Sequence, residues 1–131
     1  MSQENVGIVR RYYECLNARD AEGCLELLAP DVEIAQPHLP DGGTYRGREG
    51  WRRWNETLDA AWSELRWEPQ SFVDAGDAVL VAVRFVSTGS HTAIEQAVDR
   101  FQVIRVRDGR IVFTTGYGRR AEALAAVGLS E

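Results

Sequence analysis

Three side chains of this sequence have the chemistry needed for acid–base work: Asp99, Tyr12 and His38. A carboxyl enclosed among apolar side chains has a raised pKa, so it can donate a hydrogen bond or take a proton near neutral pH. A tyrosine hydroxyl can donate a hydrogen bond, and a histidine near an acid, here Asp41, can act as a general base. We expect these three residues to be catalytic if the protein is an enzyme.

Each of the three residues also has a purely structural interpretation. Asp99 can be paired with an arginine at the wide end of a sheet, and His38 can be an exposed loop residue. Tyr12 is followed by Tyr13, and only one of two neighbouring helical side chains is expected to point fully inward. The interpretations differ in one observable property, which is whether Asp99 faces an enclosed cavity.

Asp99 lies in the stretch 98–117, which predicts a β-hairpin with Asp108-Gly109 as its two-residue turn. That turn places Gly116 opposite Phe101, where the missing side chain leaves room. One face of the hairpin then mixes small, polar and apolar side chains, as the wall of a ligand cavity does. We expect this wall to contain Asp99, Phe101, Val103, Val112, Thr114 and Gly116.

The other face of the predicted hairpin is too apolar to be left exposed. A contiguous apolar patch marks an interface, and a two-fold dimer is the commonest closed oligomer. We therefore expect a homodimer through the outer face of the sheet, formed by residues that include Val98, Ile104, Val106, Ile111, Phe113 and Tyr117.

The elements before the hairpin follow from the spacing of apolar residues. A period near 3.6 predicts helices over 4–18, 21–29 and 50–65, and a last helix over 120–127. A period of two predicts strands over 31–37, 66–76 and 77–87. The third helix carries three tryptophans on one face, and we expect the pocket to be lined also by Tyr13, Trp51, Trp54 and Trp62.

Length and composition bound the class of protein. The 131 residues fit one domain, residues 1–131, and a net charge of −5 with scattered arginines disfavours nucleic acid. Cys15 and Cys24 lie in separate predicted helices without metal-ligand spacing, so we expect free thiols, no metal and no cofactor. Without a long apolar run or a leader pattern, we expect a cytoplasmic protein that does not cross a membrane.

The order of several short segments resembles the SnoaL-like branch of the NTF2-like superfamily. The segments are RYYECLNARD, LELLAPDVEI and GGTYRGREG, followed by a hairpin with DGRIV and then RAEALAAVGL. The resemblance implies an α+β cone, in which three N-terminal helices pack in a strongly bent antiparallel sheet and a short C-terminal helix follows. It also implies an internal cavity and, usually, a dimer through the sheet.

Several residues depart from the patterns of the enzymes in this superfamily. The positions of the histidine and the acid in SnoaL-type cyclases hold Thr114 and Gly116. Similarity to ketosteroid isomerase would make Tyr12 the oxyanion-hole tyrosine, but the base position holds Gln36, and a neutral amide cannot abstract a proton. Asp99 matches the second oxyanion-hole acid only if the hairpin is longer by about two residues.

We therefore expect a protein with an enclosed apolar pocket for a small hydrophobic organic molecule, lacking the usual cyclase and isomerase acids. The alternative is an acid–base enzyme of isomerase, cyclase or hydrolase type. It would act on a hydrophobic carbonyl or polyketide-like substrate with Asp99 and Tyr12.

Overall fold

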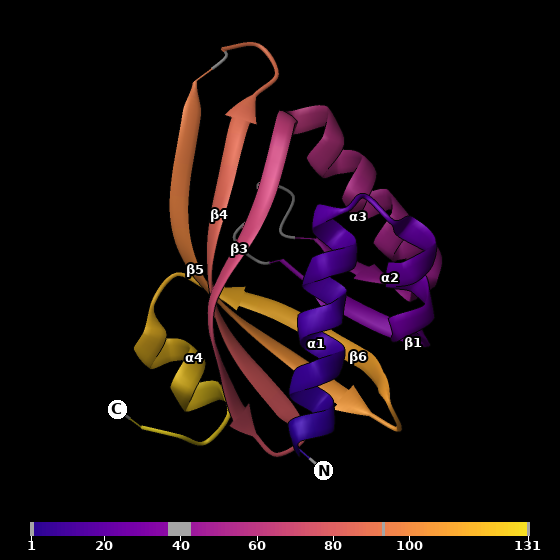
Figure 1. Ribbon diagram of the computed structural model, residues 1–131, viewed down its shortest axis with the longest axis vertical. Helices are drawn as coiled ribbons and strands as arrows, with labels where there is room; N and C mark the ends of the chain where they lie inside the picture. Colours follow the sequence, from indigo (N-terminus) through magenta and orange to yellow (C-terminus); the bar gives the residue numbers. More distant parts are fainter. Residues whose placement is uncertain (1, 37–42, 93, 131) are drawn as a thin grey trace.

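The computed structural model describes residues 2–36, 43–92 and 94–130. Within these ranges the chain forms helices around one six-stranded sheet (Figure 1). The elements in chain order are α1 Ser2–Asn17, α2 Ala21–Leu27, β1 Leu28–Ala35, β2 Thr44–Arg46, α3 Gly47–Ala61, β3 Trp62–Ala75, β4 Ala78–Gly89, β5 Glu95–Arg107, β6 Arg110–Tyr117 and α4 Arg120–Ala126.

The sheet runs in the order β2-β1-β6-β5-β4-β3 and stays open, with β2 and β3 at its edges. All neighbouring strands are antiparallel except β1 and β6, which are parallel, so the sheet is mixed rather than purely antiparallel as expected. The long strands β3, β4 and β5 bend, and the sheet curves around α1 (Figure 1). The predicted α+β fold, with three N-terminal helices and a short C-terminal one, is confirmed.

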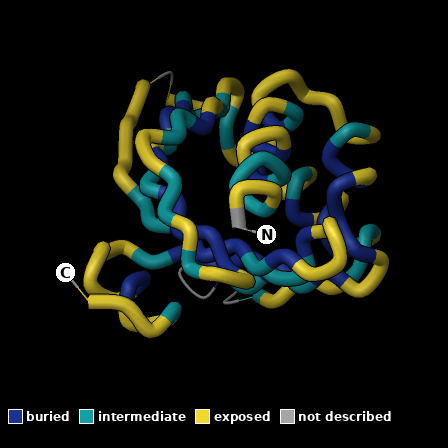
Figure 2. The backbone as a smooth tube through the Cα atoms, turned by 60° about the horizontal axis from the view of Figure 1, so that its bottom comes forward, coloured by how far each residue is buried: buried dark blue, intermediate teal, exposed yellow. Residues whose placement is uncertain are grey.

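The main core lies between the concave face of the sheet and the first three helices. From α1 it takes Val9 and Leu16, and from β4 it takes Val79, Val81 and Val83 at alternate positions. A smaller cluster on the convex face consists of Ala78, Leu80, Val103, Ala123 and Leu124, where α4 covers the sheet. Figure 2 shows the buried segments gathered where the sheet meets the helices.

Among the element boundaries that differ from the prediction, two have a clear physical cause. The second helix ends at Leu27, and Leu28 is already extended. Pro30 disfavours helical backbone in Ala29, the residue before it, so the helix cannot continue to residue 29. The third helix ends at Ala61 instead of residue 65, so Trp62 begins β3. There its ring meets Phe85 of β4 edge to face at 5.2 Å between centroids.

The predicted register of the hairpin was wrong beyond its first two pairs, the second of which joins Val106 and Ile111. Arg107 pairs with Arg110 as expected, but a β-bulge beside Arg105 and Val106 shifts the ladder by one residue. Phe101 therefore pairs with Tyr117, and Gln102 pairs with Gly116. Because side chains alternate along a strand, this one-residue shift moves half of the predicted cavity wall to the other face.

No helix within the described ranges combines the length and the apolar character that crossing a bilayer requires.

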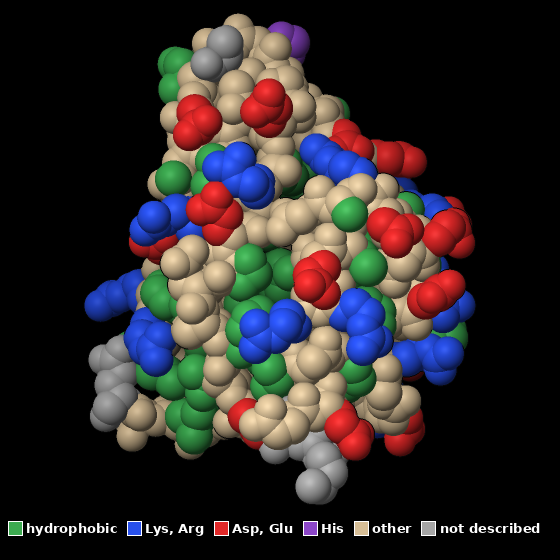
Figure 3. All heavy atoms as spheres, in the orientation of Figure 1, with side chains coloured by type: hydrophobic (Ala, Val, Ile, Leu, Met, Phe, Trp, Pro, Cys, Tyr) green, Lys and Arg blue, Asp and Glu red, His purple; other side chains and the backbone are tan. Residues whose placement is uncertain are grey.

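On the face shown in Figure 3, acidic and arginine side chains are interspersed.

Candidate functional site

A cavity of about 180 Å³ opens on the concave side of the sheet, where α3 approaches β3, β4 and β5. We call it the aromatic cavity. Its wall consists of four aromatic rings, two aliphatic side chains, two amides and one guanidinium: Gln36, Trp54, Leu58, Trp62, Trp67, Phe85, Val98, Arg100 and Gln102. Larger open grooves of about 470 and 280 Å³ lie along the edge strand β3 and between α1 and α3, and charged side chains line both.

A narrow extension of about 10 Å³ continues the aromatic cavity toward α1. The two spaces share Gln36, Trp54, Trp67 and Gln102, and the extension ends among α1 and β6 side chains that include Tyr12, Tyr13, Leu16 and Thr114. This extension has room for no more than about one water molecule, so the space for a ligand is the aromatic cavity itself.

The aromatic wall is built around Trp67. Its ring lies 4.7 Å from Phe85 and 6.2 Å from Trp54, measured between centroids, and Phe85 in turn contacts Trp62. The contacts of Phe85 are edge to face at 68° and 78°, the arrangement that aromatic quadrupoles favour. The rings therefore hold one another in place, and the wall is formed without a ligand.

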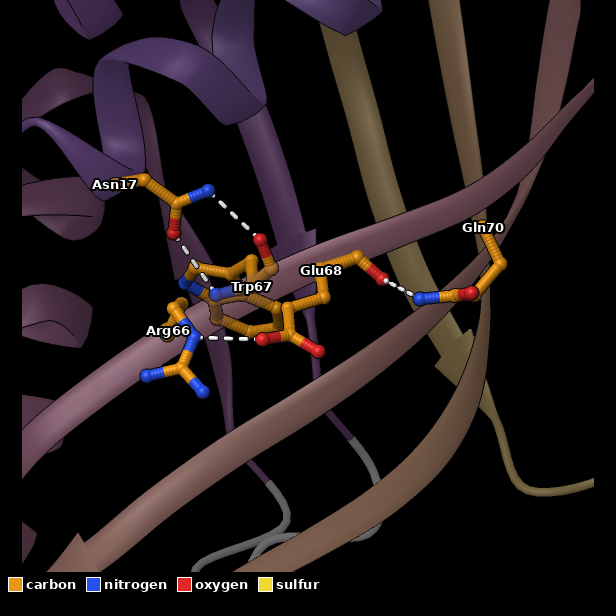
Figure 4. Close-up of polar contacts among 5 residues, drawn as sticks. All are labelled: Asn17, Arg66, Trp67, Glu68 and Gln70. Carbon is orange, nitrogen blue, oxygen red and sulfur yellow. Dashed lines mark hydrogen bonds and ion pairs between the residues drawn. The ribbon is translucent and has the colours of Figure 1, made fainter.

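The backbone of Trp67 is fixed by Asn17, the last residue of α1 (Figure 4). The Asn17 amide donates to Trp67 O at 2.7 Å and accepts from Trp67 N at 2.8 Å. β3 is an edge strand, so Asn17 satisfies backbone groups that have no neighbouring strand on that side. Figure 4 also shows Arg66 and Glu68, the neighbours of Trp67 on either side along the strand, joined at 2.6 Å.

The polar part of the wall comes mainly from β5. Val98, Arg100 and Gln102 are alternate residues of this strand, so they share one face. The Gln102 amide lies over Gly116, where a Cβ atom would come within 2.7 Å of Nε2. Gly116 thus provides the space that the sequence predicted, but for Gln102 rather than opposite Phe101.

Tyr12 and Tyr13 are both buried, contrary to the expectation that only one points inward. The hydroxyl of Tyr12 accepts a hydrogen bond from Trp51 Nε1 of α3 at 2.9 Å, while Tyr13 packs against Trp67 and Phe72 of β3. Burial raises the pKa of both hydroxyls well above the usual value of 10.0, so both stay neutral near pH 7.

Asp99 lies on the convex face, opposite to the cavity that was expected to enclose it. Its side chain is 62% exposed, and its Oδ1 accepts from Arg84 Nε at 3.0 Å. Asp99 is therefore paired with an arginine on the surface. It is not the cavity-enclosed carboxyl with a raised pKa that acid–base chemistry would require. The bulge in the hairpin is the physical reason, because it changes which residues of β5 face inward.

The other predicted site residues are dispersed. Trp54 and Trp62 line the aromatic cavity, while Tyr12, Tyr13 and Thr114 line only its extension. Trp51 lines the groove between α1 and α3, and Phe101 and Val103 pack on the convex side with α4. His38 lies outside the described residues.

Sequence reasoning missed Trp67, Phe85, Arg100 and Gln102, together with Gln36 as a cavity residue. One signal was available. Gly116 and Gly118 stand at alternate positions at the end of β6, and they lie beside Gln102 and Arg100. Within the described ranges, no group of three His, Cys, Asp or Glu side chains is placed to hold a metal ion.

A family model described as a SnoaL-like domain matches residues 9–114. An NTF2-like protein of unknown function from Burkholderia pseudomallei is 26% identical, with a TM-score of 0.80 over 95% of this chain and 98% of that one. A Mycobacterium tuberculosis protein in complex with estradiol-17beta-hemisuccinate is 24% identical, with a TM-score of 0.73 over 86% and 92%. TerC co-crystallised with polyporic acid is 23% identical, with a TM-score of 0.80 over 95% and 98%. No curated protein matches the chain.

The family model covers most of the chain, and the similar structures share its arrangement of helices and sheet. The chain belongs to the family of SnoaL-like domains, and its fold is NTF2-like.

Proposed function

We propose that this protein binds a small apolar organic molecule in the aromatic cavity. The observation that carries the proposal is the preformed wall of Trp54, Trp62, Trp67 and Phe85 around a space of about 180 Å³. Burying a flat apolar ligand against such rings removes its surface from water, and little side-chain entropy is lost because the rings are already packed. The cavity is smaller than the range of about 300–1,000 Å³ usual for drug-sized ligands, so a molecule of one or two rings fits it best.

Two structures with the same fold support a ring-bearing ligand. One was solved with estradiol-17beta-hemisuccinate and the other with polyporic acid. At their levels of identity the similarity concerns the fold alone. It supports the view that this fold can enclose a molecule of that kind.

The composition of the wall favours binding over acid–base catalysis. Among the described residues, no Asp or Glu lines the aromatic cavity or its extension. Gln36, which the resemblance to ketosteroid isomerase would place at the base position, is a neutral amide. Tyr12 remains a neutral hydroxyl that can donate a hydrogen bond, but a donor without a base does not complete a proton transfer.

The test is titration of the protein with 2-naphthamide, a neutral two-ring probe, by isothermal titration calorimetry. Val98→Trp places a large ring at the cavity wall, and Ala97→Trp is the matched control because its side chain lies on the other face of β5. We expect wild type and Ala97→Trp to bind the probe and Val98→Trp to bind at least about 10-fold more weakly. Equal binding by the two variants would place the site elsewhere, and the proposal would be refuted if wild type bound neither this probe nor its anionic analogue 2-naphthoate.

A homodimer through the outer face of the sheet stays a prediction, but Ile104, Val106 and Ile111, which were expected on that face, lie in the main core instead. α4 covers the apolar part of that face, and the part over β4 and β5 carries the exposed ion pair between Arg84 and Asp99. A dimer there would therefore have a polar contact surface. Sedimentation equilibrium at micromolar concentration measures the mass, and the mass of a single chain would contradict the dimer.

A further inference from the structure

We propose that the ligand of the aromatic cavity carries an anionic group, such as a carboxylate, which binds the guanidinium of Arg100. This inference rests on the proposed function and adds the chemical class of the ligand. The observation that carries it is a cation with no counter-ion among the described residues, in a wall otherwise made of aromatic, aliphatic and neutral amide side chains.

Arg100 is placed in the cavity by the register of β5. It alternates with Val98 and Gln102 on the concave face, whereas Asp99 points to the convex side, where it pairs with Arg84. Arg100 Nη1 lies 3.9 Å from the position that a Cβ atom of Gly118 would occupy. The guanidinium therefore extends toward Gly118, just beyond the end of β6, where there is no side chain to fill the space.

The charge of Arg100 is not neutralised within the described part of the chain. None of the hydrogen bonds or ion pairs found there involves its guanidinium, and no acid lines the aromatic cavity. Seven other arginines differ in this respect, because carboxylates on the exposed surface pair with Arg19, Arg46, Arg52, Arg66, Arg84, Arg105 and Arg107. Others, such as Arg11, Arg53 and Arg110, are exposed to solvent, whereas Arg100 is half-buried.

Leaving a half-buried cation unpaired is unfavourable, since burial removes part of its hydration. Burial is also what lowers the pKa of Arg100 below its ordinary value, with no carboxylate acting in the opposite direction. The guanidinium stays charged in spite of this shift, because arginine does not lose its proton in proteins. An anionic ligand would supply the missing partner and a bidentate contact of the kind that guanidinium and carboxylate form.

Two neutral donors lie in the same wall. Gln36 and Gln102 are 5% and 7% exposed, and within the described ranges no hydrogen bond uses either side-chain amide. Each amide has two N–H donors available for an acceptor-rich group. Gln102 is held over Gly116, so its amide is presented to the cavity rather than packed into the core. The wall thus offers donors to an anion and no competing carboxylate.

The test compares two probes of the same size and ring system, the anionic 2-naphthoate and the neutral 2-naphthamide, by isothermal titration calorimetry at pH 7. We expect wild type to bind 2-naphthoate about 10-fold more tightly than 2-naphthamide, the usual gain from a hydrogen bond to a charged group. In Arg100→Met, which keeps an unbranched apolar stem and removes the guanidinium and its charge, the ratio should fall to about 1. Arg100→Lys should keep part of the ratio, because it retains the charge without the planar fork.

The matched control is Arg84→Met. It removes the same charge from the neighbouring strand, but on the convex face, so it should leave the ratio unchanged. The inference is overturned if wild type binds the two probes equally, or if Arg100→Met keeps the preference for 2-naphthoate. In either case, binding of 2-naphthamide would still support the proposed function. If wild type binds neither probe, the proposed function and this inference both fail.

Discussion

At the scale of single residues, the neighbouring side chains Tyr12 and Tyr13 of α1 differ in their hydrogen bonding. Both rings are buried. The Tyr12 hydroxyl accepts a hydrogen bond from Trp51 Nε1, whereas the Tyr13 hydroxyl takes part in none of the hydrogen bonds found among the described residues. A buried donor that loses its acceptor costs about 1–3 kcal/mol, whereas a hydroxyl without a protein partner costs little to remove. The two positions therefore form a matched pair of deletions.

We expect Tyr12→Phe to lower the free energy of unfolding by about 1–3 kcal/mol, because it leaves the buried Trp51 Nε1 unpaired. Tyr13→Phe removes the same atom from the next residue and should cost less than about 1 kcal/mol. Urea unfolding, followed by circular dichroism, measures both values. Equal losses in the two variants would show that the hydrogen bond to Trp51 does not stabilise the fold.

At the scale of elements, α1 holds the edge strand β3 within the strand and just beyond its end. Asn17 makes two hydrogen bonds to the Trp67 backbone, and Asn5 donates one exposed hydrogen bond to Gly76 O at 3.1 Å. The Asn17 contact lies directly behind the aromatic wall. It therefore connects the end of a helix to the shape of the cavity.

Asn17→Ala should destabilise the protein by about 1–3 kcal/mol, since two backbone groups of the edge strand lose their partner. It should also weaken binding of 2-naphthamide, because Trp67 is no longer fixed. Asn5→Ala is the control on the same helix and should change stability by less than about 0.5 kcal/mol. The prediction fails if Asn17→Ala unfolds at the same urea concentration as Asn5→Ala.

Two helical glycines have opposite surroundings. A Cβ atom at Gly50 of α3 would lie 2.9 Å from the backbone carbon of Tyr45, while a Cβ atom at Gly7 of α1 would meet nothing within 4 Å. We expect Gly50→Ala to cost about 1–3 kcal/mol through overpacking. Gly7→Ala should stabilise by about 0.5–1 kcal/mol, because alanine has the higher helix propensity. Thermal unfolding measures both shifts, and a stabilising Gly50→Ala would contradict this account of the α3 start.

At the scale of the whole molecule, the stability at alkaline pH depends on a small set of buried thiol and hydroxyl groups. The sequence contains no lysine that would titrate in the same pH range. Burial raises the pKa of the Cys24 thiol to about 12, and it raises those of the Tyr12 and Tyr13 hydroxyls as well. In the unfolded chain these groups ionise near their ordinary values of 9.0 and 10.0, whereas the folded state keeps them protonated.

Stability should therefore be constant up to about pH 8.5 and fall as pH rises through the unfolded pKa values toward the folded ones, because the folded state then binds more protons. Urea unfolding between pH 8 and pH 11 measures the slope. In Cys24→Ala the part of the decline that begins near pH 9 should be smaller. An unchanged free energy of unfolding across this range would contradict the burial of these groups.

The sequence by itself determined the fold class and most of its elements. The periods of 3.6 and two come from the chain alone, so α1, α4 and the Asp108-Gly109 turn of the hairpin were predicted close to their observed positions. Element boundaries that depend on tertiary contacts were not predicted. Trp62 sits in β3 rather than α3 because its partners are Phe85 and the β4 backbone, which lie far along the chain.

Only the tertiary structure decided which residues form the candidate site. A single extra residue in β6, between Ile111 and Phe113, exchanges the two faces of β5. It places Arg100 and Gln102 in the cavity and Asp99 on the outside, paired with Arg84. A bulge shifts the ladder register by one residue, and whether it forms depends on which register packs better against both faces of the sheet. Local sequence carries little information about that packing, although Gly116 and Gly118 mark where it leaves space.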